Sequence, residues 1–409
     1  MPETSGCRSC GSSRLRTFLS LGKVPLPTAL LTEAQLREPE ARFPLDVAHC
    51  PNCSLVQILE DVPPEQLFVD NYLYFSSFSD ELLRHSREHA LGLIKERELG
   101  PDNLVVELAS NDGYLLSNFV EAGVPVLGID PAPDQADAAE RAGVPTLQEF
   151  FGLDLARRIR AERGPADVII ANNVMAHIPD LNGFVGGMAH LLAEDGIATI
   201  ENPYVRDLID NCEFDTIYHE HFFYYSCTAV DHLVRRHGMY LNDVEYFPEL
   251  HGGTLRWHVG HNEDVSETVR GYLANERARG IADFGYYASF AERVDGIRDR
   301  LLSLLAELRG GGARIAAYGA AAKGSTLLNY IGIGPDLVDF VVDRNVHKQG
   351  KHMPGVHIPV RAPEALLEEQ PDYVLMLSWN FRDEILRQQQ EYLRRGGRFI
   401  VPVPDPEVI

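Results

Sequence analysis

The chain has 409 residues with 45% hydrophobic and 9% aromatic side chains, a composition typical of a soluble globular protein with two or three domains. Its 37 Lys and Arg residues against 60 Asp and Glu residues give a formal net charge of −23, which argues against a nucleic-acid partner. No run approaches the roughly 20 apolar residues of a membrane span, and the N-terminus lacks a signal-peptide pattern. We therefore expect a cytoplasmic protein with no membrane partner, and the sequence implies no protein partner.

Four of the six cysteines form two matched C-x-x-C pairs, Cys7 with Cys10 and Cys50 with Cys53. Each pair turns the chain tightly enough for both thiolates to reach one ion, and two pairs complete a closed Cys₄ zinc site. Two disulfides are the alternative, but they fit poorly with the expected cytoplasmic location, where thiols stay reduced. A thioredoxin-like redox site would need only one pair. We therefore predict a structural Zn²⁺ ion.

The first domain is expected to span residues 1–78, which are rich in proline and show little periodic pattern. A segment so poor in core formers needs a metal for stability. It ends in an unusually aromatic stretch, residues 71–77. A helical stripe of apolar residues then runs to about Glu98, where Gly100 and Pro101 end it.

Short apolar strands alternate with helical segments in the middle of the chain. The strands are expected at Leu104–Glu107, Val126–Ile129, Val168–Ile170 and Ile197–Ile200. This alternation predicts a doubly wound parallel sheet.

The turn after the first strand carries the cofactor hypothesis. It has an acid at the strand end, Glu107, then small residues and a glycine, Gly113, where a helix begins and backbone N–H groups face a ligand. Asp130 closes the second strand, where such folds hold a ribose diol, and a helix cap is the alternative. The G-x-G-x-x-G pattern of dinucleotide sites is absent, which disfavours an NAD-dependent dehydrogenase. One glycine with an upstream acid resembles class I methyltransferases, so we predict that S-adenosylmethionine binds here. The expected cofactor contacts are Glu107, Ser110, Asn111, Gly113, Asp130, Asn172 and Asn173.

Two histidine-bearing segments are candidates for the chemistry. The third strand leads into Asn172–His177, a loop that borders the methyl group in methyltransferases, although His177 alone is more often structural. Tyr218-His219-Glu220-His221 gathers three titratable groups and a phenol. Its spacing is wrong for an H-E-x-x-H metal site. A metal pair on one strand face and a structural role remain alternatives, but proton transfer is the better use of these groups.

The C-terminal third begins with a helical run from Ser266 to Gly310. A strand at Arg314–Tyr318 then leads through Gly319 into a helix that carries Lys323. Such a turn holds a diphosphate through backbone N–H groups and the lysine charge, and a plain strand–helix turn is the alternative.

Four passages together resemble the sugar C-methyltransferases of antibiotic deoxysugar pathways: the paired cysteines, Asn172-Asn-Val-Met-Ala-His177, Tyr218-His-Glu-His221 and Tyr318-Gly-Ala-Ala-Ala-Lys323-Gly324. The resemblance covers essentially the whole chain. It implies an α/β protein in which a class I S-adenosylmethionine methyltransferase domain is flanked by an N-terminal zinc-ribbon-like domain and a C-terminal Rossmann-like domain. The expected boundaries are 1–78, 79–262 and 263–409.

The resemblance also implies a substrate and roles for individual residues. The substrate is a dTDP-linked 4-keto-deoxysugar, and His221 is the base. The other implied active-site residues are Tyr72, His177, Tyr218 and Glu220. Substrate contacts are expected from Tyr74, Phe75, Lys323, Ser325, Asn329 and Arg344.

The residues agree with this chemistry when they are considered on their own. A base removes the proton beside the C4 keto group, Tyr218 or His177 supplies a hydrogen bond to the enolate oxygen, and C3 is methylated. Rival hypotheses are C5 methylation, N- or O-methylation, and a zinc-ribbon binding protein with a degenerate methyltransferase domain. The N/O alternative leaves the His and Tyr cluster unexplained.

Overall fold

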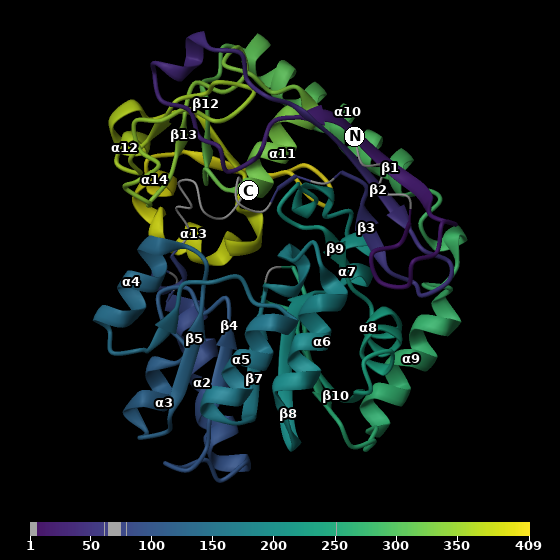
Figure 1. The fold of residues 1–409 in the computed structure, drawn as a ribbon. Coiled ribbons are helices and arrows are strands. Elements are labelled where there is room, and N and C mark those ends of the chain that lie inside the picture. Colours follow the sequence, from purple (N-terminus) through teal and green to yellow (C-terminus); the bar gives the residue numbers. More distant parts are fainter. Residues whose placement is uncertain (1–5, 61, 64–74, 79, 251) are drawn as a thin grey trace.

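Three β-sheets organise the computed structural model, which describes residues 6–60, 62–63, 75–78, 80–250 and 252–409. The central sheet occupies the lower half of Figure 1, and the N-terminal and C-terminal sheets lie together above it. No helix in the described part of the chain has the length and apolar character that a membrane crossing requires.

The N-terminal sheet is antiparallel and draws on two distant parts of the sequence. It has the order β1 (Arg16–Val24), β2 (Phe43–His49), β3 (Val56–Ile58) and β9 (Phe223–Tyr224). β9 follows the Tyr218–His221 segment directly and lies far beyond the expected boundary of the first domain. The first domain and the candidate catalytic segment therefore share one hydrogen-bonded sheet.

The central sheet is doubly wound, as the sequence predicted. Its order is β10-β11-β8-β7-β4-β5-β6, with parallel pairing from β8 to β6 and antiparallel pairing of β11 with both β8 and β10. The four strands expected from the sequence are found as β4 (Val105–Leu108), β5 (Val126–Ile129), β7 (Ala166–Asn172) and β8 (Leu192–Pro203). The remaining strands, which the sequence analysis did not identify, are β6 (Thr146–Leu147), β10 (Tyr240–Phe247) and β11 (Thr254–Gly260).

Helices cover both faces of this central sheet. On one face, buried side chains of α2 (Asp80–Glu96), α3 (Ser117–Glu121) and α4 (Pro133–Arg141) form a core with Val105 and Val168. The opposite face is covered by α5 (Leu153–Arg163) and α6 (Leu181–Leu191). α7 (Val205–Asp210) and α8 (Cys227–Arg235) follow later in the chain.

The C-terminal sheet has the order β14-β13-β12-β15-β16-β17, and all its strands are parallel except β17. The strands are β12 (Ile315–Tyr318), β13 (Val341–Val342), β14 (Val360–Arg361), β15 (Tyr373–Met376), β16 (Arg398–Val401) and β17 (Glu407–Val408). The helices are α11 (Ala322–Ile331), α12 (Ala365–Glu369), α13 (Arg382–Gln388) and α14 (Gln390–Arg394). Because the chain order reverses between β12 and β15, a crevice is expected beyond the carboxyl ends of these two strands.

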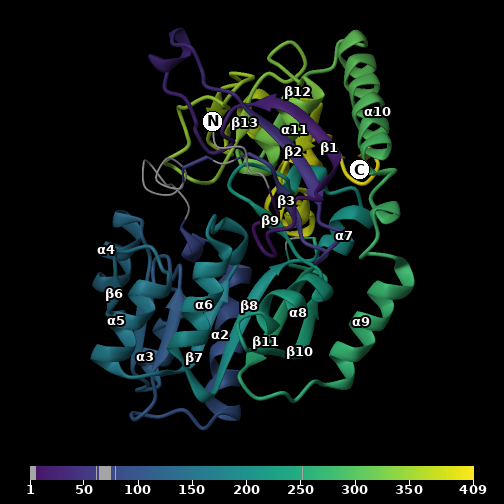
Figure 2. The same ribbon diagram turned by 45° about the vertical axis from the view of Figure 1, so that its right-hand side comes forward.

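The helical run expected from Ser266 to Gly310 is two helices. α9 (Glu267–Arg279) ends where Gly280 adopts a φ of +76°, and α10 (Phe290–Gly310) begins ten residues later. A left-handed residue after the last turn is the usual helix stop. α10 then runs alongside β1, as Figures 1 and 2 show.

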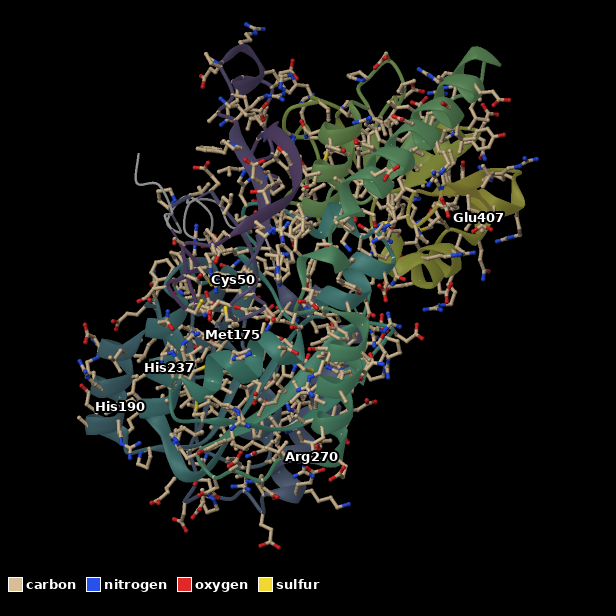
Figure 3. All side chains as sticks on the ribbon, turned by 90° about the vertical axis from the view of Figure 1, so that its right-hand side faces the viewer. Cys50, Met175, His190, His237, Arg270 and Glu407 are labelled. Carbon is tan, nitrogen blue, oxygen red and sulfur yellow. The ribbon has the colours of Figure 1, made fainter. Side chains whose placement is uncertain are left out.

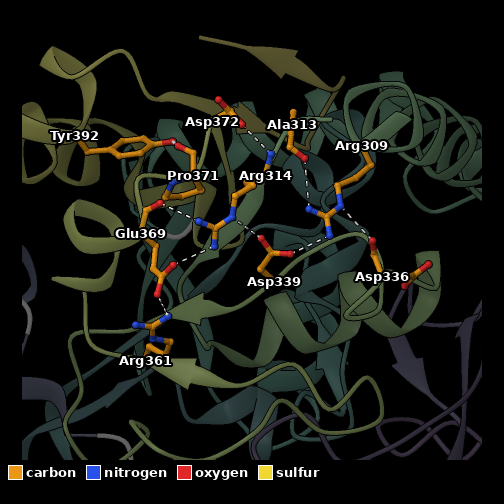
Figure 4. A network of polar contacts seen from close by, with 10 residues as sticks. All are labelled: Arg309, Ala313, Arg314, Asp336, Asp339, Arg361, Glu369, Pro371, Asp372 and Tyr392. Atoms are coloured by element: carbon orange, nitrogen blue, oxygen red, sulfur yellow. Dashed lines mark hydrogen bonds and ion pairs between the residues drawn. The ribbon is translucent and has the colours of Figure 1, made fainter. Parts of the chain in front are cut away.

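Ion pairs close the amino ends of the C-terminal strands (Figure 4). The backbone N–H of Arg314 donates to Asp372 Oδ2 over 2.8 Å, and the Arg314 guanidinium pairs with Asp339 and Glu369. Arg309 pairs with Asp339 as well, over 2.9 Å. These side chains are partly exposed, so each pair stabilises the domain only modestly. The network leaves the opposite, carboxyl edge of the sheet for the crevice.

A buried carboxylate joins α9 to the central domain. Glu276 is 1% exposed and accepts hydrogen bonds from Tyr204 Oη over 2.7 Å and from the backbone N–H groups of Cys227 and Thr228 over 2.8 Å each. The two N–H groups are at the start of α8, where they have no partner within the helix. The Glu276 charge also favours the positive end of the α8 dipole.

We expect Glu276→Gln to lower the free energy of unfolding by about 1–3 kcal/mol, because a charged acceptor of buried N–H groups is replaced by a neutral amide. Chemical denaturation followed by tryptophan fluorescence measures the change. Glu267→Gln on the same helix is the matched control, since that side chain is 87% exposed and its loss should stay within about 0.5 kcal/mol. Equal effects of the two substitutions would contradict this role for Glu276.

Candidate active site

The four paired cysteines converge on one point. Their sulfur atoms all lie within 4.8 Å of one another, with 3.5 Å between Cys7 and Cys53 and 3.6 Å between Cys10 and Cys50. A disulfide bond would need about 2.0 Å. Tetrahedral zinc with bonds of about 2.3 Å separates its sulfur ligands by about 3.8 Å, so the cluster fits a Zn²⁺ ion.

Cys50→Ser should release the metal, because a closed structural site loses most of its affinity when one thiolate is removed. We expect about one zinc per chain in the wild type and much less in the variant, measured by elemental analysis of the purified proteins. Cys212→Ser removes a buried thiol outside the cluster and should leave the zinc content unchanged. A ratio that is equal in all three proteins would count against this site.

The zinc module packs directly onto the central domain. Asn182 Nδ2, at the start of α6, donates to the carbonyl of Arg8 over 2.8 Å, inside the first cysteine pair. The Arg8 guanidinium lies 4.9 Å from the centroid of the Phe222 ring, and the Ile58 N–H donates to the Phe222 carbonyl over 3.0 Å. Figure 3 labels Cys50 and Met175 at neighbouring levels of the molecule, above His237 and His190. The zinc module therefore supports the residue that follows His221.

Tyr218, His177 and His221 lie together. The ring centroids of His177 and His221 are 4.8 Å apart, and those of Tyr218 and His221 are 4.1 Å apart. A hydrogen bond of 2.9 Å joins Tyr218 Oη to His221 Nε2. These side chains come from the loop after β7 and from the segment before β9, so the two sheets together bring them into contact.

Carbonyl groups define the tautomers of both histidines. His221 Nδ1 lies 3.0 Å from the carbonyl of Thr216, and His177 Nδ1 lies 2.6 Å from the carbonyl of Glu220. A carbonyl only accepts, so each Nδ1 carries a proton, and in the neutral ring Nε2 is the unprotonated nitrogen. Burial lowers the pKa of His177 to about 4, which keeps this ring neutral near pH 7.

Glu220 is buried at the junction of the three domains. Its carboxylate accepts a short hydrogen bond from Thr28 Oγ1 of the N-terminal domain. Burial raises the pKa of Glu220 to about 7, against the opposing effects of Thr28 and of the charge on Lys348 in the C-terminal domain. The Nε2 atom of the neighbouring His219 lies 3.0 Å from the carbonyl of Pro44, also in the N-terminal domain.

The cofactor turn adopts an unusual backbone. Ala109, Asn111 and Gly113 all have positive φ angles, of +57°, +48° and +78°, although only the last is glycine. The Asp130 carboxylate holds the turn, because its Oδ2 accepts from the Asn111 N–H and its Oδ1 from the Ala132 N–H, each over 2.9 Å. Each oxygen retains a second lone pair, so the carboxylate can cap the loop and accept a ribose hydroxyl as well.

Buried polar atoms around this turn fit the polar groups of S-adenosylmethionine. In the part of the chain that the structure describes, Glu107 Oε2, Ser110 Oγ and Asn172 Oδ1 are buried without a hydrogen-bond partner. Burial, reinforced by the charge of Asp130, raises the pKa of Glu107 well above its usual range, and a cationic amino group would reverse this shift. The N–H of Asn173 donates to the Glu201 carbonyl over 2.8 Å, which positions the loop after β7.

Asp130→Asn should weaken the binding of S-adenosylhomocysteine by about 1–3 kcal/mol, since the amide loses the charge and one acceptor oxygen. Isothermal titration calorimetry measures this loss. Asp134→Asn changes an exposed acid in the first turn of α4 and should leave the affinity unchanged. If Asp130→Asn bound the cofactor as tightly as the wild type, Asp130 would be only a cap of the loop.

The residues expected to contact the substrate are dispersed. Tyr72 and Tyr74 lie outside the described residues, and Phe75 is partly buried beside Ser76, whose N–H donates to Asn111 Oδ1 over 2.9 Å. Ser325 is buried in α11 and its carbonyl accepts from Asn329 Nδ2, which also donates to the Pro354 carbonyl. Arg344 is half-exposed and pairs with Glu384 over 3.2 Å.

Lys323 lies at the crevice of the C-terminal sheet, with its Nζ 4.4 Å from the centroid of the Trp379 ring. The loops after β12 and β15 meet here, and a Cβ at Gly319 would come within 2.2 Å of Ser378 Oγ. Asp343 accepts from the N–H groups of Ala320 and Asn345, each over 2.8 Å. This repeats the arrangement of Asp130 at the cofactor turn.

Some residues around the site have no clear sequence signal. Thr28 stands in a proline-rich segment without a recognisable motif, and Trp379 follows a strand that the sequence analysis did not identify. Asp215 lies three residues before Tyr218, but its neighbour in space, Trp379, is distant in the sequence. The one sequence signal at Trp379 is the rarity of tryptophan, since the chain has only two.

Three family models match the chain in succession: a zinc binding domain over residues 7–68, a methyltransferase domain over residues 78–243, and a C-methyltransferase C-terminal domain over residues 249–404. The cysteine cluster lies in the first and the cofactor turn in the second. The protein is therefore an S-adenosylmethionine-dependent methyltransferase with a zinc-binding N-terminal domain.

The C-methyltransferase NovU of Streptomyces niveus is 37% identical over 406 residues, which cover 98% of this chain and 96% of that protein. The chain belongs to the C-methyltransferase family that its motifs indicated, and its cofactors are S-adenosylmethionine and zinc.

Solved structures of methyltransferases are also similar, at low identity. The magnesium protoporphyrin IX methyltransferase ChlM of Synechocystis PCC 6803 with bound SAM is 13% identical with a TM-score of 0.35, covering 48% of this chain and 89% of that one. An S-adenosylmethionine-dependent methyltransferase from Clostridium acetobutylicum is 13% identical with a TM-score of 0.36, covering 44% and 92%.

Proposed function

We propose that the protein methylates C3 of a dTDP-linked 4-keto-deoxysugar through an enolate, in cytoplasmic antibiotic deoxysugar biosynthesis. The observation that carries the proposal is the contact between Tyr218 and His221 beside His177, in a chain that belongs to the C-methyltransferase family. The three domains proposed from the sequence, 1–78, 79–262 and 263–409, each supply part of the site.

Carbon is a poor nucleophile unless a proton next to a carbonyl group is removed. His221 suits this task because the Thr216 carbonyl holds the Nδ1 proton and leaves Nε2 as the basic atom. S-adenosylmethionine, when bound, supplies the electrophilic methyl group. The residues of the cofactor turn and the loop after β7 would then keep the methyl donor and the sugar in line, which accelerates the reaction by positioning alone.

Tyr218 is the better placed donor to the enolate oxygen. The neutral His177 has a single N–H, which the backbone carbonyl of Glu220 already accepts, and the backbone of Asn173 contacts the same ring, so His177 has no N–H left for the enolate. The Tyr218 hydroxyl carries a proton, and a protonated His221 Nε2 would donate to Tyr218 Oη and so strengthen its bond to the enolate. His177 Nε2 and the Glu220 carboxyl then serve as acceptors for sugar hydroxyl or amino groups.

The crevice of the C-terminal sheet is the proposed site for the nucleotide part of the substrate. Ligands of open α/β sheets bind where the strand order reverses, and Lys323 and Gly319 lie at that point. The charge of Lys323 suits a diphosphate in an otherwise acidic protein. Phe75, Ser325, Asn329 and Arg344 remain proposed contacts, together with Tyr72 and Tyr74.

His221→Asn should reduce methyl transfer by about 10²–10⁴-fold, the usual contribution of a general base. Binding of S-adenosylhomocysteine should be unchanged in calorimetry. The variant should also stop the exchange of the C3 proton with deuterated water, measured by NMR on a dTDP-4-keto sugar. Tyr218→Phe should cost about 10²–10³-fold in rate, because one donor to the enolate oxygen is lost.

His232→Asn on the exposed surface of α8 is the control and should retain full activity. If His221→Asn kept more than about a tenth of the wild-type turnover, the role of base would pass to Tyr218. NMR analysis of the product identifies the methylated atom. A methyl group on C5, or on nitrogen or oxygen, would overturn the C3 proposal in favour of that rival.

A further inference from the structure

Asp215 is a buried carboxylate six residues before His221 that the proposed chemistry does not use. It is 0% exposed and belongs to the short 3₁₀ helix Phe214–Thr216, at the boundary with the C-terminal domain. Its Oδ2 accepts a hydrogen bond of 2.7 Å from the indole N–H of Trp379. The donor follows β15, so one hydrogen bond joins the C-terminal crevice to the segment that leads to His221.

Lys323 strengthens this connection. Its Nζ lies 4.4 Å from the centroid of the same Trp379 ring, and its charge acts on the Asp215 and Glu213 carboxyls. Burial raises the pKa of Asp215 to about 6, and Lys323 and the Trp379 N–H oppose that shift. The cation comes from the first turn of α11 and the indole from the segment after β15, so both belong to the elements that border the crevice.

The backbone next to Asp215 determines the orientation of His221. Thr216 follows Asp215 directly, and its carbonyl accepts the Nδ1 proton of His221 over 3.0 Å. The turn is held by the Glu213 carbonyl, which accepts from Thr216 Oγ1 over 2.7 Å and from its N–H over 3.1 Å. Phe214 packs on Tyr330 of α11, with the ring centroids 5.4 Å apart. The direction of the Thr216 carbonyl is therefore set where η4, the 3₁₀ helix Phe214–Thr216, meets the C-terminal domain.

We propose that Asp215 is a positioning residue for His221, and that the hydrogen bond from Trp379 keeps His221 in the tautomer with a basic Nε2. The inference rests on the proposed role of His221 as the base. Through Asp215, the C-terminal domain does more than bind the nucleotide: it fixes the imidazole on which enolisation depends.

Trp379→Phe tests the proposal, because it removes the indole N–H and keeps an aromatic ring for Lys323. We expect kcat to fall about tenfold, equivalent to about 1.4 kcal/mol, within the range of a hydrogen bond to a charged group. KM for the sugar nucleotide and the affinity for S-adenosylhomocysteine should change little. The ¹⁵N chemical shifts of His221, assigned by comparison with His221→Asn, should show a reduced population of the Nδ1–H tautomer.

Tyr330→Phe is the matched control. It also removes one hydrogen bond to a carboxylate, that of Tyr330 Oη to Asp295 of α10 over 2.7 Å, and keeps the ring against Phe214. Its kcat and its His221 spectrum should equal those of the wild type.

Replacing Asp215 itself separates hydrogen bonding from simple packing. Asp215→Asn retains an oxygen that accepts from Trp379 and should lose less activity than Asp215→Ala. Equal losses in these two variants, or an unchanged His221 spectrum and a kcat within about twofold in Trp379→Phe, would overturn the proposal. If Asp215→Ala does not fold, Trp379→Phe alone decides. The ¹⁵N spectrum reports on Asp215 even if His221→Asn proves active and the role of base passes to another residue.

Discussion

The pairing of β3 with β9 is the constraint on which the arrangement of the proposed catalytic residues depends. Gln57 and Val56 of β3 are paired with Phe223 and Tyr224 of β9. The segment from Tyr218 to His221 therefore leads into a strand that is bonded to the strand following the second cysteine pair. The same segment meets the loop after β7 through the N–H of Phe222, which donates to the Ala176 carbonyl over 2.7 Å. His177 and His221 lie together because Phe222, between His221 and β9, is hydrogen-bonded both to Ile58 of β3 and to Ala176 of the loop after β7.

Burial is the largest influence on the pKa values of the acids around the site. Glu107, Asp130, Asp215 and Glu220 all have raised pKa values, because the effect of burial exceeds any opposing effects of hydrogen bonds and, for Asp215 and Glu220, of Lys323 and Lys348. Glu201 shows the contrast. Burial alone would raise its pKa, but the hydrogen bond from His85 and the charge of Arg256 lower it to about 2. An acid at the candidate site can therefore still pair with a cationic or hydroxyl-bearing ligand. Glu201 cannot, because its ionised carboxylate is already paired with Arg256 and His85.

Patterns local to the sequence predicted much of this molecule, and contacts between distant segments escaped them. The alternation of strands and helices predicted the central sheet, and the cysteine spacing predicted the zinc cluster. Ala109 and Asn111 adopt left-handed backbone conformations that their residue types do not predict. The turn is held by the Asp130 carboxylate at the end of the next strand, which accepts a hydrogen bond from the Asn111 N–H. β9 has only two residues, so no periodicity marks it as a strand. Asn329 and Ser325 were expected to contact the substrate, but Asn329 Nδ2 donates to the Ser325 carbonyl and to the carbonyl of Pro354, in a loop that no motif indicates.

The shared sheet also defines what can be exchanged between related enzymes. The N-terminal domain contributes a hydrogen bond from Thr28 to Glu220, the Pro44 carbonyl that contacts His219, and the three-stranded sheet to which β9 is added. A chimaera that swaps the first domain at its linker would leave the recipient's catalytic segment against a foreign edge. The unit of recombination is discontinuous: residues 6–60 must travel with residues 218–225, although more than a third of the chain separates them. The proposed catalytic segment and the N-terminal domain thus form one structural module, and a crossover between the two segments would separate its parts.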